Sequence, residues 1–248
     1  MIGREIIRLG SVGSTMDVVA NLAADGAVEG VVVIADEQTS GRGRSGRSWI
    51  APPGSGLLMS VLLRPQVPAE RLSSLSLAAG VAVAEALEQF GLAPTLKWPN
   101  DIWLDGRKVA GILVTTRVGP GGISAIVGIG INVNLDAGDL PPGATSVSEA
   151  IGTFIPRDDI LQAVLARLDA AYLAFTSTSG ELNLAGWTRR AALIGEQVQV
   201  VDGPARQSGK MLGIDGEGAL LLRGDDGELI RIIAGDLTRG PRTVDSIG

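Results

Sequence analysis

The 248-residue sequence contains no cysteine and no histidine, and these two absences restrict the chemistry that the chain can perform. Without cysteine there are no disulfides, no thiolate zinc sites and no thioester intermediates. Without histidine the usual general base is missing, together with every Ser-His or Cys-His arrangement. Any catalysis must therefore use lysine, arginine, carboxylates, backbone N–H groups or a metal ion held by oxygen.

Aromatic residues are also scarce, at 3% of the chain, so alanine, valine, leucine and isoleucine must fill the hydrophobic core. A hydrophobic share of 45% is sufficient for such a core and argues against global disorder. The formal net charge of −6 argues against a general affinity for DNA or RNA. The apolar stretch 75–87 is interrupted by Gly80 and Glu85 and is too short to span a bilayer. With no signal-peptide pattern at the N-terminus, we expect a soluble cytoplasmic protein.

Hydrophobic periodicity and turn residues predict a large α/β domain followed by a small β-rich module. The pattern favours helices over 14–24, 69–90, 156–175 and 180–190, and strands over 31–38, 56–65 and 123–135. After Gly195, Asp-Gly pairs recur at 202–203, 215–216 and 226–227 between short β-rich runs. That rhythm is typical of a small β-barrel or meander, and we place the boundary near residue 190.

Residues 41–47, GRGRSGR, carry three arginines and three glycines directly after the predicted strand 31–38. The planar guanidinium group suits carboxylate and phosphate oxygens, and glycine allows the backbone to approach a ligand closely. Open α/β sheets also place ligands at strand ends. A solvated basic loop is the alternative interpretation. We favour a loop that is mobile when empty and closes over an anionic ligand.

Residues 95–116 form a candidate β-hairpin with Asp105-Gly106 as its turn. A two-residue loop pairs Leu104 with Arg107, Trp103 with Lys108, Ile102 with Val109 and Asp101 with Ala110. Asp101 and Lys108 then become diagonal neighbours on one face, with backbones roughly 7–8 Å apart. Together with Asn100 they suggest a phosphate and Mg²⁺ site, because Mg²⁺ prefers oxygen ligands. The alternatives are a turn in which Asp101 binds local backbone, and a surface lysine.

The predicted strand 123–135 has two unlike faces, one of which is apolar. The other face carries Gly128, Gly130, Asn132 and Asn134. Glycines on one face leave a shelf for a flat ligand, although they also relieve crowding against a helix. Ser14-Thr15 stands at the start of the first predicted helix, where the hydroxyls either cap the helix or contact a polar ligand group.

Taken together, these stretches make the sequence resemble the biotin–protein ligases over roughly residues 8–240. The residues that carry the resemblance are Ser14-Thr15, EQTSGRGRSGRSW (37–49), KWPNDI (97–102), GRKVAGIL (106–113), GIGINVN (128–134), TSVSEAIG (145–152) and GDL (235–237). The resemblance implies a mixed α/β catalytic domain of the class II aminoacyl-tRNA-synthetase-like type over 1–190. It also implies a small SH3-like β-barrel over 191–248.

The resemblance implies a two-step reaction with ATP, Mg²⁺ and biotin. The biotin carboxylate attacks the α-phosphorus of ATP to give biotinyl-AMP, and a lysine of a biotin carboxyl carrier protein of acetyl-CoA or a related carboxylase then displaces AMP. Neither step needs a protein nucleophile, a thiol or an imidazole, because positioning and charge stabilisation can carry the chemistry. Asp101 or water would accept the proton of the incoming lysine.

The resemblance also implies roles for individual residues, with Lys108, Arg44 and Asp101 as the catalytic groups. The polar head of biotin would bind Ser14, Thr15 and Gln38. Arg42, Arg44 and Lys108 would hold the biotin carboxylate and the phosphate, and Trp49 would cover the adenine side. Asn100, Asp101 and Asn132 would serve the ATP phosphates, with Asp101 and Asn132 on Mg²⁺. The glycines that would let biotin lie against backbone are Gly41, Gly111, Gly128 and Gly130.

Two departures from the family pattern shape the remaining expectations. The catalytic pattern begins almost at Met1, so we expect no DNA-binding domain and no DNA or membrane partner, in a monomer or homodimer. Met16 stands where the family often has asparagine. A lipoate ligase would lack the arginine and KWPND motifs, and an octanoyl transferase of the cysteine type is excluded. An RNA-binding module would need a wider basic surface with aromatics, and an inactive relative would have lost motif residues that are present here.

Overall fold

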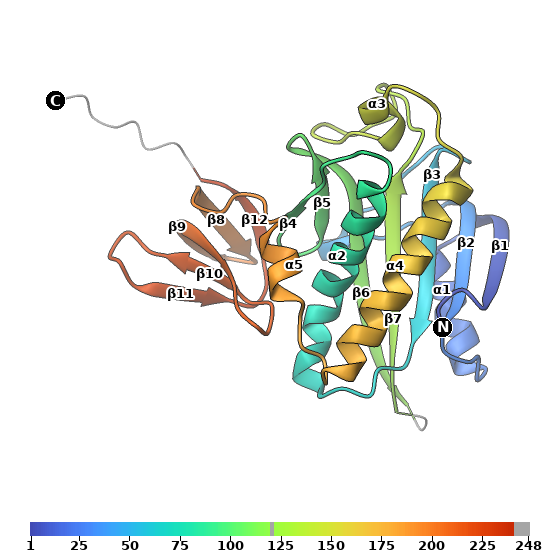
Figure 1. Ribbon diagram of the computed structural model, residues 1–248, viewed down its shortest axis with the longest axis horizontal. Helices are drawn as coiled ribbons and strands as arrows, with labels where there is room; N and C mark the ends of the chain where they lie inside the picture. Colours follow the sequence, from blue (N-terminus) through green and yellow to red (C-terminus); the bar gives the residue numbers. More distant parts are fainter. Residues whose placement is uncertain (120–121, 241–248) are drawn as a thin grey trace.

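The computed structural model describes residues 1–119 and 122–240. Its larger part is a seven-stranded sheet in the order β1-β2-β3-β7-β6-β5-β4, with helices on both faces (Figure 1). The strands are β1 (Glu5–Val12), β2 (Val31–Gln38), β3 (Gly56–Leu63), β4 (Thr95–Lys97), β5 (Asp101–Leu104), β6 (Arg107–Gly119) and β7 (Gly122–Asn132). Strands β1 and β2 pair in parallel and the other neighbours pair antiparallel, so the sheet is mixed, as the resemblance implies.

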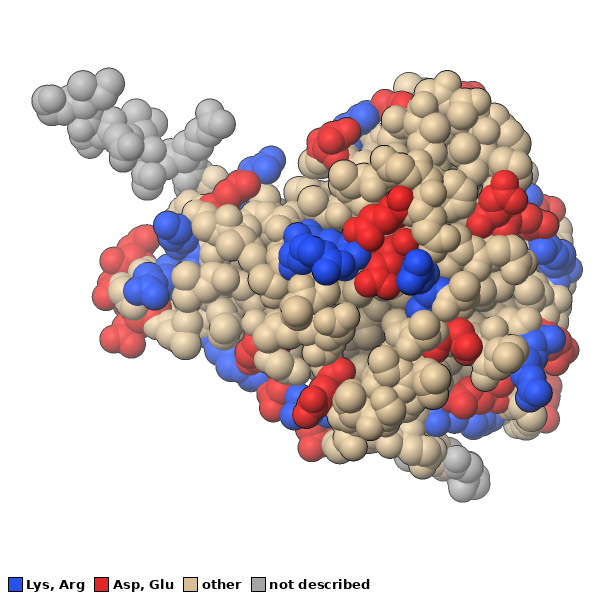
Figure 2. Space-filling model, in the orientation of Figure 1, with Lys and Arg blue, Asp and Glu red and all other residues tan. Residues whose placement is uncertain are grey.

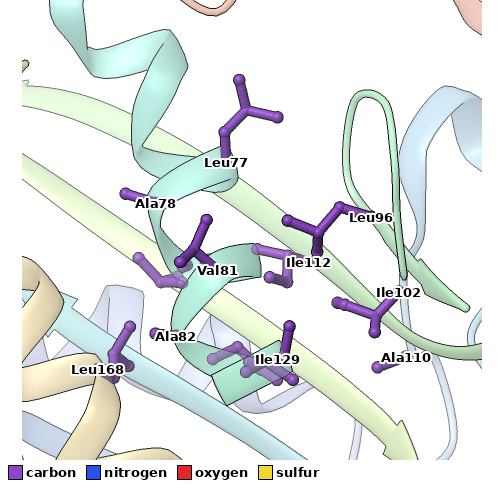
Figure 3. Close-up of a cluster of buried hydrophobic side chains, with 14 of the residues drawn as sticks. Leu77, Ala78, Val81, Ala82, Leu96, Ile102, Ala110, Ile112, Ile129 and Leu168 are labelled. Carbon is purple, nitrogen blue, oxygen red and sulfur yellow. The ribbon is translucent and has the colours of Figure 1, made fainter. Parts of the chain in front are cut away.

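Three of the helices cover the two faces of this sheet. The helices of the larger part are α1 (Thr15–Ala24), α2 (Leu75–Glu88), α3 (Val147–Ile151), α4 (Arg157–Ser177) and α5 (Leu184–Thr188). Alternation along β2 places Val32 and Ile34 in the main core with α2 and α4, and Val33 in a second cluster with α1. Figure 3 shows α2 side chains such as Val81 packed toward Ile112 and Ile129 of the sheet. The core is mainly aliphatic, as the scarcity of aromatics predicts, with Trp98, Trp187 and Phe175 as buried aromatics within it.

The helix predicted over 69–90 is divided in the structure. Residues Ala69–Ser74 form a 3-10 helix, and α2 follows at Leu75. The hydroxyls of Ser73 and Ser74 donate to the carbonyl oxygens of Glu70 and Arg71, at 3.3 and 2.7 Å. Such local side-chain bonds compete with the backbone ladder of an α-helix, and here they accompany the tighter first turns.

The predicted hairpin is present, but its register is only partly as predicted. The turn is Asp105-Gly106, with φ of 48° and 74°, as the two-residue turn requires. Beyond Trp103 and Lys108, which face each other, a β-bulge shifts the register. Ile102 therefore faces Ala110 and Asp101 faces Gly111. The predicted pairs Ile102 with Val109 and Asp101 with Ala110 are wrong.

The bulge coincides with a long-range contact. The N–H of Lys108 donates to the carbonyl oxygen of Gly143 at 2.8 Å, and the N–H of Thr145 donates to the carbonyl oxygen of Lys108 at 2.9 Å. Segment 143–145 thus pairs with β6 at the position where the extra residue enters the strand. A bulge of this kind bends the strand and re-aims a side chain, here that of Lys108.

The C-terminal part is a five-stranded antiparallel sheet in the order β11-β10-β9-β8-β12. Its strands are β8 (Gln197–Asp202), β9 (Ala205–Ile214), β10 (Leu220–Arg223), β11 (Leu229–Ile232) and β12 (Asp236–Arg239). The side chains of Val198, Met211 and Leu222 are fully buried in it. The fold class is the expected one, a mixed α/β part followed by a small SH3-like β module. Within the described residues, the strand pairings form a sheet that is not closed into a barrel.

The C-terminal sheet packs directly against the larger part (Figure 1). The indole N–H of Trp98 donates to the carbonyl oxygen of Gly218 at 3.0 Å, and Arg71 donates to Gly216 at 3.1 Å. A Cβ at Gly218 would lie 2.5 Å from a methyl group of Leu77, so the contact depends on glycine there. Buried side chains of both parts belong to one continuous hydrophobic cluster.

The surface over α2 and α4 carries both signs of charge. Basic and acidic side chains form small mixed groups on this face, and uncharged surface lies between the groups (Figure 2). This face therefore lacks the continuous basic surface that is typical of nucleic-acid binding. In the part of the chain that the structure describes, no helix combines the length and the apolar character needed to cross a bilayer.

Candidate active site

A cavity forms where the first turn of α1, the arginine loop, the β5–β6 hairpin and β7 meet. All the residues to which the resemblance assigns a role line it, apart from Gly41 and Asn132. Those lining residues are Ser14, Thr15, Gln38, Arg42, Arg44, Trp49, Asn100, Asp101, Lys108, Gly111, Gly128 and Gly130. The lining residues that sequence reasoning did not assign are Met16, Gly43, Arg47, Ser48, Met59, Ile112, Leu113 and Ile129.

One end of the cavity is a neutral hydrogen-bond network. The side-chain oxygen of Gln38 accepts the backbone N–H of Thr15 at 2.8 Å and is 3.0 Å from the Thr15 hydroxyl. That hydroxyl is also 2.8 Å from the hydroxyl of Ser60. Thr15 is 2% exposed and Ser60 is fully buried, so the bond between their hydroxyls is out of contact with water. The network fixes the side chain of Gln38 at the edge of the cavity.

Ser14 occupies the residue position before α1 but does not cap the helix with its side chain. Its backbone is extended, and within the described residues its hydroxyl makes no capping hydrogen bond. The residue is 2% exposed and lines the cavity. A buried hydroxyl that is not used for capping is available to a polar ligand group.

The glycine shelf on β7 is present and is covered by side chains of the same chain. A Cβ at Gly128 would lie 2.8 Å from the sulfur of Met16, and a Cβ at Gly130 would lie 2.4 Å from the ring of Trp49. Gly111 on β6 lets Trp49 and Lys108 approach, with 3.0 and 3.1 Å to its Cβ position. At Gly128 the covering side chain comes from α1, which fits the alternative that glycine relieves crowding against a helix. Binding of a flat ligand on the shelf stays a prediction.

The indole N–H of Trp49 is a hydrogen-bond donor without a partner in the described part of the chain. Its nitrogen atom is buried. Buried donors are nearly always paired in folded proteins, so an unpaired one at a cavity points to a ligand or water as its acceptor. The ring also faces the ammonium group of Lys108, which lies 5.4 Å from the ring centroid.

The other end of the cavity is charged. The ammonium nitrogen of Lys108 lies 2.6 Å from a carboxylate oxygen of Asp101, so the pair that the hairpin predicts is formed in spite of the bulge. The guanidinium of Arg44 donates at 3.3 Å to the side-chain oxygen of Asn100 and at 3.3 Å to the carbonyl oxygen of Gly235. Lys108 and Arg44 are partly exposed, at 34% and 23%. Four cationic side chains line the cavity, and Asp101 is the carboxylate among the described lining residues.

The C-terminal sheet contributes to the charged end through Asp236 on β12. A carboxylate oxygen of Asp236 lies 2.7 Å from Arg47 and 3.8 Å from Arg44. At the rim of the loop, Arg42 pairs instead with Asp17 of α1 at 2.6 Å. Each arginine of the loop thus has a partner within the chain. The predicted mobility of the empty loop stays a prediction.

Gly41 and Asn132 lie outside the lining. A Cβ at Gly41 would lie 2.3 Å from the carbonyl oxygen of Trp49 and 3.0 Å from the amide nitrogen of Gln38. The absence of a side chain at Gly41 therefore allows the backbone at Trp49 to approach the start of the loop. The amide of Asn132 donates to the carbonyl oxygen of Thr145 at 3.0 Å and is buried. Its position gives no support to the predicted roles in binding ATP and Mg²⁺.

Lys97 is a further cation on the same side of the hairpin. It faces Asp101 across β4 and β5, and its ammonium group lies 5.1 Å from the ring centroid of Trp103. Burial lowers the pKa of Lys97 below its usual value, and the nearby carboxylate of Asp101 opposes that shift. The interpretation of Lys97 as an ordinary surface lysine therefore does not describe its surroundings.

The donor set limits how a metal ion would be held. Within the described residues, no group of three or more acidic side chains gathers in a metal-binding arrangement. Asp101 is the carboxylate that lines the cavity, and it is paired with Lys108. A Mg²⁺ ion here would depend on phosphate oxygens of a bound nucleotide and on water, which suits the way Mg²⁺ binds to nucleotides.

Comparisons with known families and proteins agree with one another. Residues 11–134 match the model of the biotin/lipoate A/B protein ligase family, and residues 193–237 match the biotin protein ligase C-terminal domain. The chain is 40% identical over 211 residues to a biotin–[acetyl-CoA-carboxylase] ligase of Paracoccus denitrificans, covering 80% of this chain and 86% of the relative. A ligase of the same name from Mycobacterium tuberculosis is 34% identical over 242 residues, covering 94% and 88%.

The fold is similar to that of solved structures as well. The biotin protein ligase from Aquifex aeolicus, solved in complex with biotin and ATP, superimposes with a TM-score of 0.83 at 32% identity. The superposition covers 96% of this chain and 100% of that one. Both the α/β part and the C-terminal sheet are therefore shared with that structure.

Proposed function

This chain belongs to the biotin protein ligase family, and we propose that the cavity described above is where it activates and transfers biotin. The protein is a ligase that uses ATP to attach biotin to a lysine of a biotin carboxyl carrier protein, through biotinyl-5′-AMP. The observation that supports this site most strongly is its polarity, because a neutral network and a cationic cluster lie at opposite ends of one glycine-lined cavity.

The neutral end suits the head of biotin. The ring urea offers one carbonyl oxygen and two N–H groups, which need donors and acceptors of matching direction. Ser14, Thr15 and Gln38 supply hydroxyl and amide groups that are already held in place. The apolar part of the bicycle then lies against the Gly128 shelf, where Met16 packs now. Neutral polar groups are buried here without the desolvation penalty of a charge.

The charged end suits the first chemical step. The biotin carboxylate attacks the α-phosphorus of ATP, and the bond from that phosphorus to the pyrophosphate oxygen breaks. Negative charge grows on the phosphoryl oxygens as this happens, and the cations of Lys108 and Arg44 stabilise it. Asp101 holds the Lys108 ammonium at 2.6 Å, which keeps it pointed into the cavity.

Trp49 and the phosphates define the nucleotide side. The indole ring lies on the Gly130 shelf, and its buried N–H has no hydrogen-bond partner in the described part of the chain. We place the adenylate against this ring. Mg²⁺ would enter with the phosphates of ATP and neutralise part of their charge, with Asp101 as the nearby carboxylate.

In the second step the amine of the carrier lysine attacks the carbonyl carbon of biotinyl-AMP. The bond from that carbon to the phosphate oxygen breaks, and AMP leaves with its charge held by the same cations. The amine must lose a proton, because its reference pKa is about 10.4. Asp101 or a water beside it accepts that proton, since Asp101 is the acidic side chain among the described lining residues.

We propose that residues 1–190 form the catalytic domain and that residues 191–248 form the second module. The contacts of Asp236 and Gly235 with the arginine loop support a role of the module in holding that loop over the cavity. We propose that the loop shields biotinyl-AMP from water until the carrier lysine arrives.

Isothermal calorimetry tests this function directly. Biotin should bind with a Kd below about 1 μM, and lipoate should give no heat. Adding ATP with Mg²⁺ should then release pyrophosphate in a biotin-dependent reaction. Absence of heat with biotin under all conditions would exclude the ligase function for this cavity.

A further inference from the structure

Ser60 lies in an unusual place for a hydroxyl group. It occupies the middle of β3, whose eight residues are all buried, and its own exposed fraction is 0%. Every other residue of that strand apart from Gly56 is aliphatic or methionine. Burying a hydroxyl without a partner costs about 1–3 kcal/mol. The hydroxyl of Ser60 meets that of Thr15 at 2.8 Å, so its partner is a residue of the cavity wall.

The direction of the hydrogen bonds in this network follows by elimination. The backbone N–H of Thr15 can only donate, so the Gln38 atom that it meets at 2.8 Å is the carbonyl-type oxygen. That oxygen can only accept, so the Thr15 hydroxyl donates to it over the 3.0 Å contact. A hydroxyl has one proton, and that of Thr15 is now used. Ser60 must therefore be the donor in the bond between the two hydroxyls.

This chain of donors, from Ser60 to Thr15 to Gln38, sets the polarity of the neutral end. The oxygen of Gln38 is turned toward Thr15, so its NH₂ group is what remains for a ligand. The Thr15 hydroxyl, with its proton and one lone pair engaged, keeps one lone pair as an acceptor. A cyclic urea is complementary to this arrangement, because its oxygen accepts from the Gln38 amide while its N–H donates to Thr15.

We propose that Ser60 is a positioning residue that fixes the donor and acceptor directions of the biotin pocket and thereby selects a neutral cyclic urea. The inference rests on the proposed function, because it assigns biotin to this cavity. Ser60 does not line the cavity, and it acts through Thr15. Its register partner on the neighbouring strand β7 is Gly128 of the shelf, so Ser60 and Gly128 lie side by side on the same face of the sheet.

Loss of the Ser60 hydroxyl should weaken the binding of biotin and leave the binding of ATP unchanged. Without its donor, the Thr15 hydroxyl is held by the Gln38 contact alone, so its remaining lone pair is less firmly directed at the urea N–H. Hydrogen bonds in such chains also polarise one another, so the Gln38 contact weakens as well. The charged end is built from other elements and is left unchanged.

The test compares Ser60→Ala with Ser74→Ala. Ser74 is also 0% exposed and also makes one side-chain hydrogen bond, to the carbonyl oxygen of Arg71 at 2.7 Å, but it lies outside the cavity lining. Pyrophosphate release is measured for each variant with biotin and with 2-iminobiotin, whose protonated guanidine presents donors where the urea presents its oxygen. The KM for biotin, the KM for ATP and kcat are determined separately.

Ser60→Ala should raise the KM for biotin about fivefold to tenfold, which is the loss of roughly one hydrogen bond. The KM for ATP and kcat should stay within about twofold, and the preference for biotin over 2-iminobiotin should narrow. Ser60→Thr keeps the donor and should retain that preference. Ser74→Ala should leave all of these quantities unchanged.

Two results would overturn the inference. One is an unchanged KM for biotin and an unchanged preference in Ser60→Ala, and the other is an equal rise in the KM for ATP, which is the sign of a merely structural serine. If Ser60→Ala does not fold, Ser60→Cys keeps the volume with a weaker donor and must shift the same two quantities. A wild-type protein without biotin-dependent pyrophosphate release would instead refute the proposed function.

Discussion

The two ends of the cavity are built from different parts of the molecule and in different ways. The neutral end is carried by β2, β3 and the first turn of α1, and Thr15 and Ser60 are 2% and 0% exposed. The charged end is carried by the arginine loop, the hairpin and a residue of the C-terminal sheet, and the Arg44 and Lys108 side chains are 23% and 34% exposed. One end is fixed by the core, and the other is held by ion pairs at the surface.

The difference follows from the cost of burying polar groups. Neutral hydroxyl and amide groups can be placed in a core at little cost when each hydrogen bond is made. Guanidinium and ammonium groups keep a large desolvation penalty even when paired, so they remain near water. The fixed end is therefore suited to recognising a ligand by shape and hydrogen bonds. At the charged end, the arginines can exchange Asp236 for the anions of the substrates while Asp101 keeps Lys108 in place.

The largest effect is expected from Lys108→Ala. Removing one pre-oriented donor to a developing charge typically costs about 100- to 1000-fold in rate, and adenylate formation should fall by that factor. Biotin-dependent pyrophosphate release measures it. Lys210→Ala, at an exposed lysine of β9, is the matched control and should be silent. A loss below about threefold in Lys108→Ala would remove this residue from the chemical step.

Arg44→Gly is expected to uncouple formation of biotinyl-AMP from its retention. Losing a charge-assisted contact of about 1.5–3 kcal/mol should speed release of the intermediate by about 10- to 100-fold. Labelling of lysines on an unrelated bystander protein, read by avidin blot, reports the leak. The exposed Arg206→Gly on β9 serves as control. Bystander labelling no higher than that of the wild type would contradict a retaining role of the loop.

Substitutions at the two shelf glycines, Gly130 and Gly128, should affect the binding of different substrates. A methyl group at Gly130 would stand 2.4 Å from the Trp49 ring, so Gly130→Ala must move the indole and should raise the KM for ATP about tenfold. A methyl group at Gly128 would meet the flexible side chain of Met16 at 2.8 Å. Gly128→Ala should therefore act more weakly, and on the KM for biotin. Steady-state kinetics with each substrate varied in turn tests the pair, and the reverse assignment would refute the proposed orientation of biotinyl-AMP.

The smallest effect is expected from Asp236→Asn in the C-terminal sheet. The Arg47 partner of Asp236 is 62% exposed, and exposed ion pairs contribute about 0–1 kcal/mol. The KM for ATP should change by no more than about fivefold, and the change should shrink in high salt because the pair is screened. Biotin binding measured by calorimetry should not change. A shift in biotin affinity as large as that in ATP would show that the two ends are not independent.

Much of this site is predictable from local sequence. The arginine loop follows a buried strand, the Asp105-Gly106 turn brings Asp101 to Lys108, and the glycines of β7 form a shelf. Each of these follows from neighbouring residues alone. The bulge in the hairpin does not, because it arises where β6 pairs with segment 143–145.

The remaining features depend on contacts between distant parts of the chain. Asp236 is 189 residues from Arg47, and nothing near either residue indicates that they meet. The covering of the shelf by Trp49 likewise requires the path of the loop in space. Ser60 did leave a signal, since a serine inside an otherwise apolar strand must find a hydrogen-bond partner. Its partner, Thr15, lies 45 residues away.

Binding of biotin and of biotinol, its alcohol analogue without the carboxylate, tests the two-ended account most directly. Calorimetry is performed with the wild type, Thr15→Val and Lys108→Ala. The account predicts that Thr15→Val weakens both ligands by the same factor, about tenfold, and that Lys108→Ala weakens biotin while biotinol binds as it does to the wild type. Equal weakening of biotin and biotinol by Lys108→Ala, or unchanged biotinol binding by Thr15→Val, would contradict it.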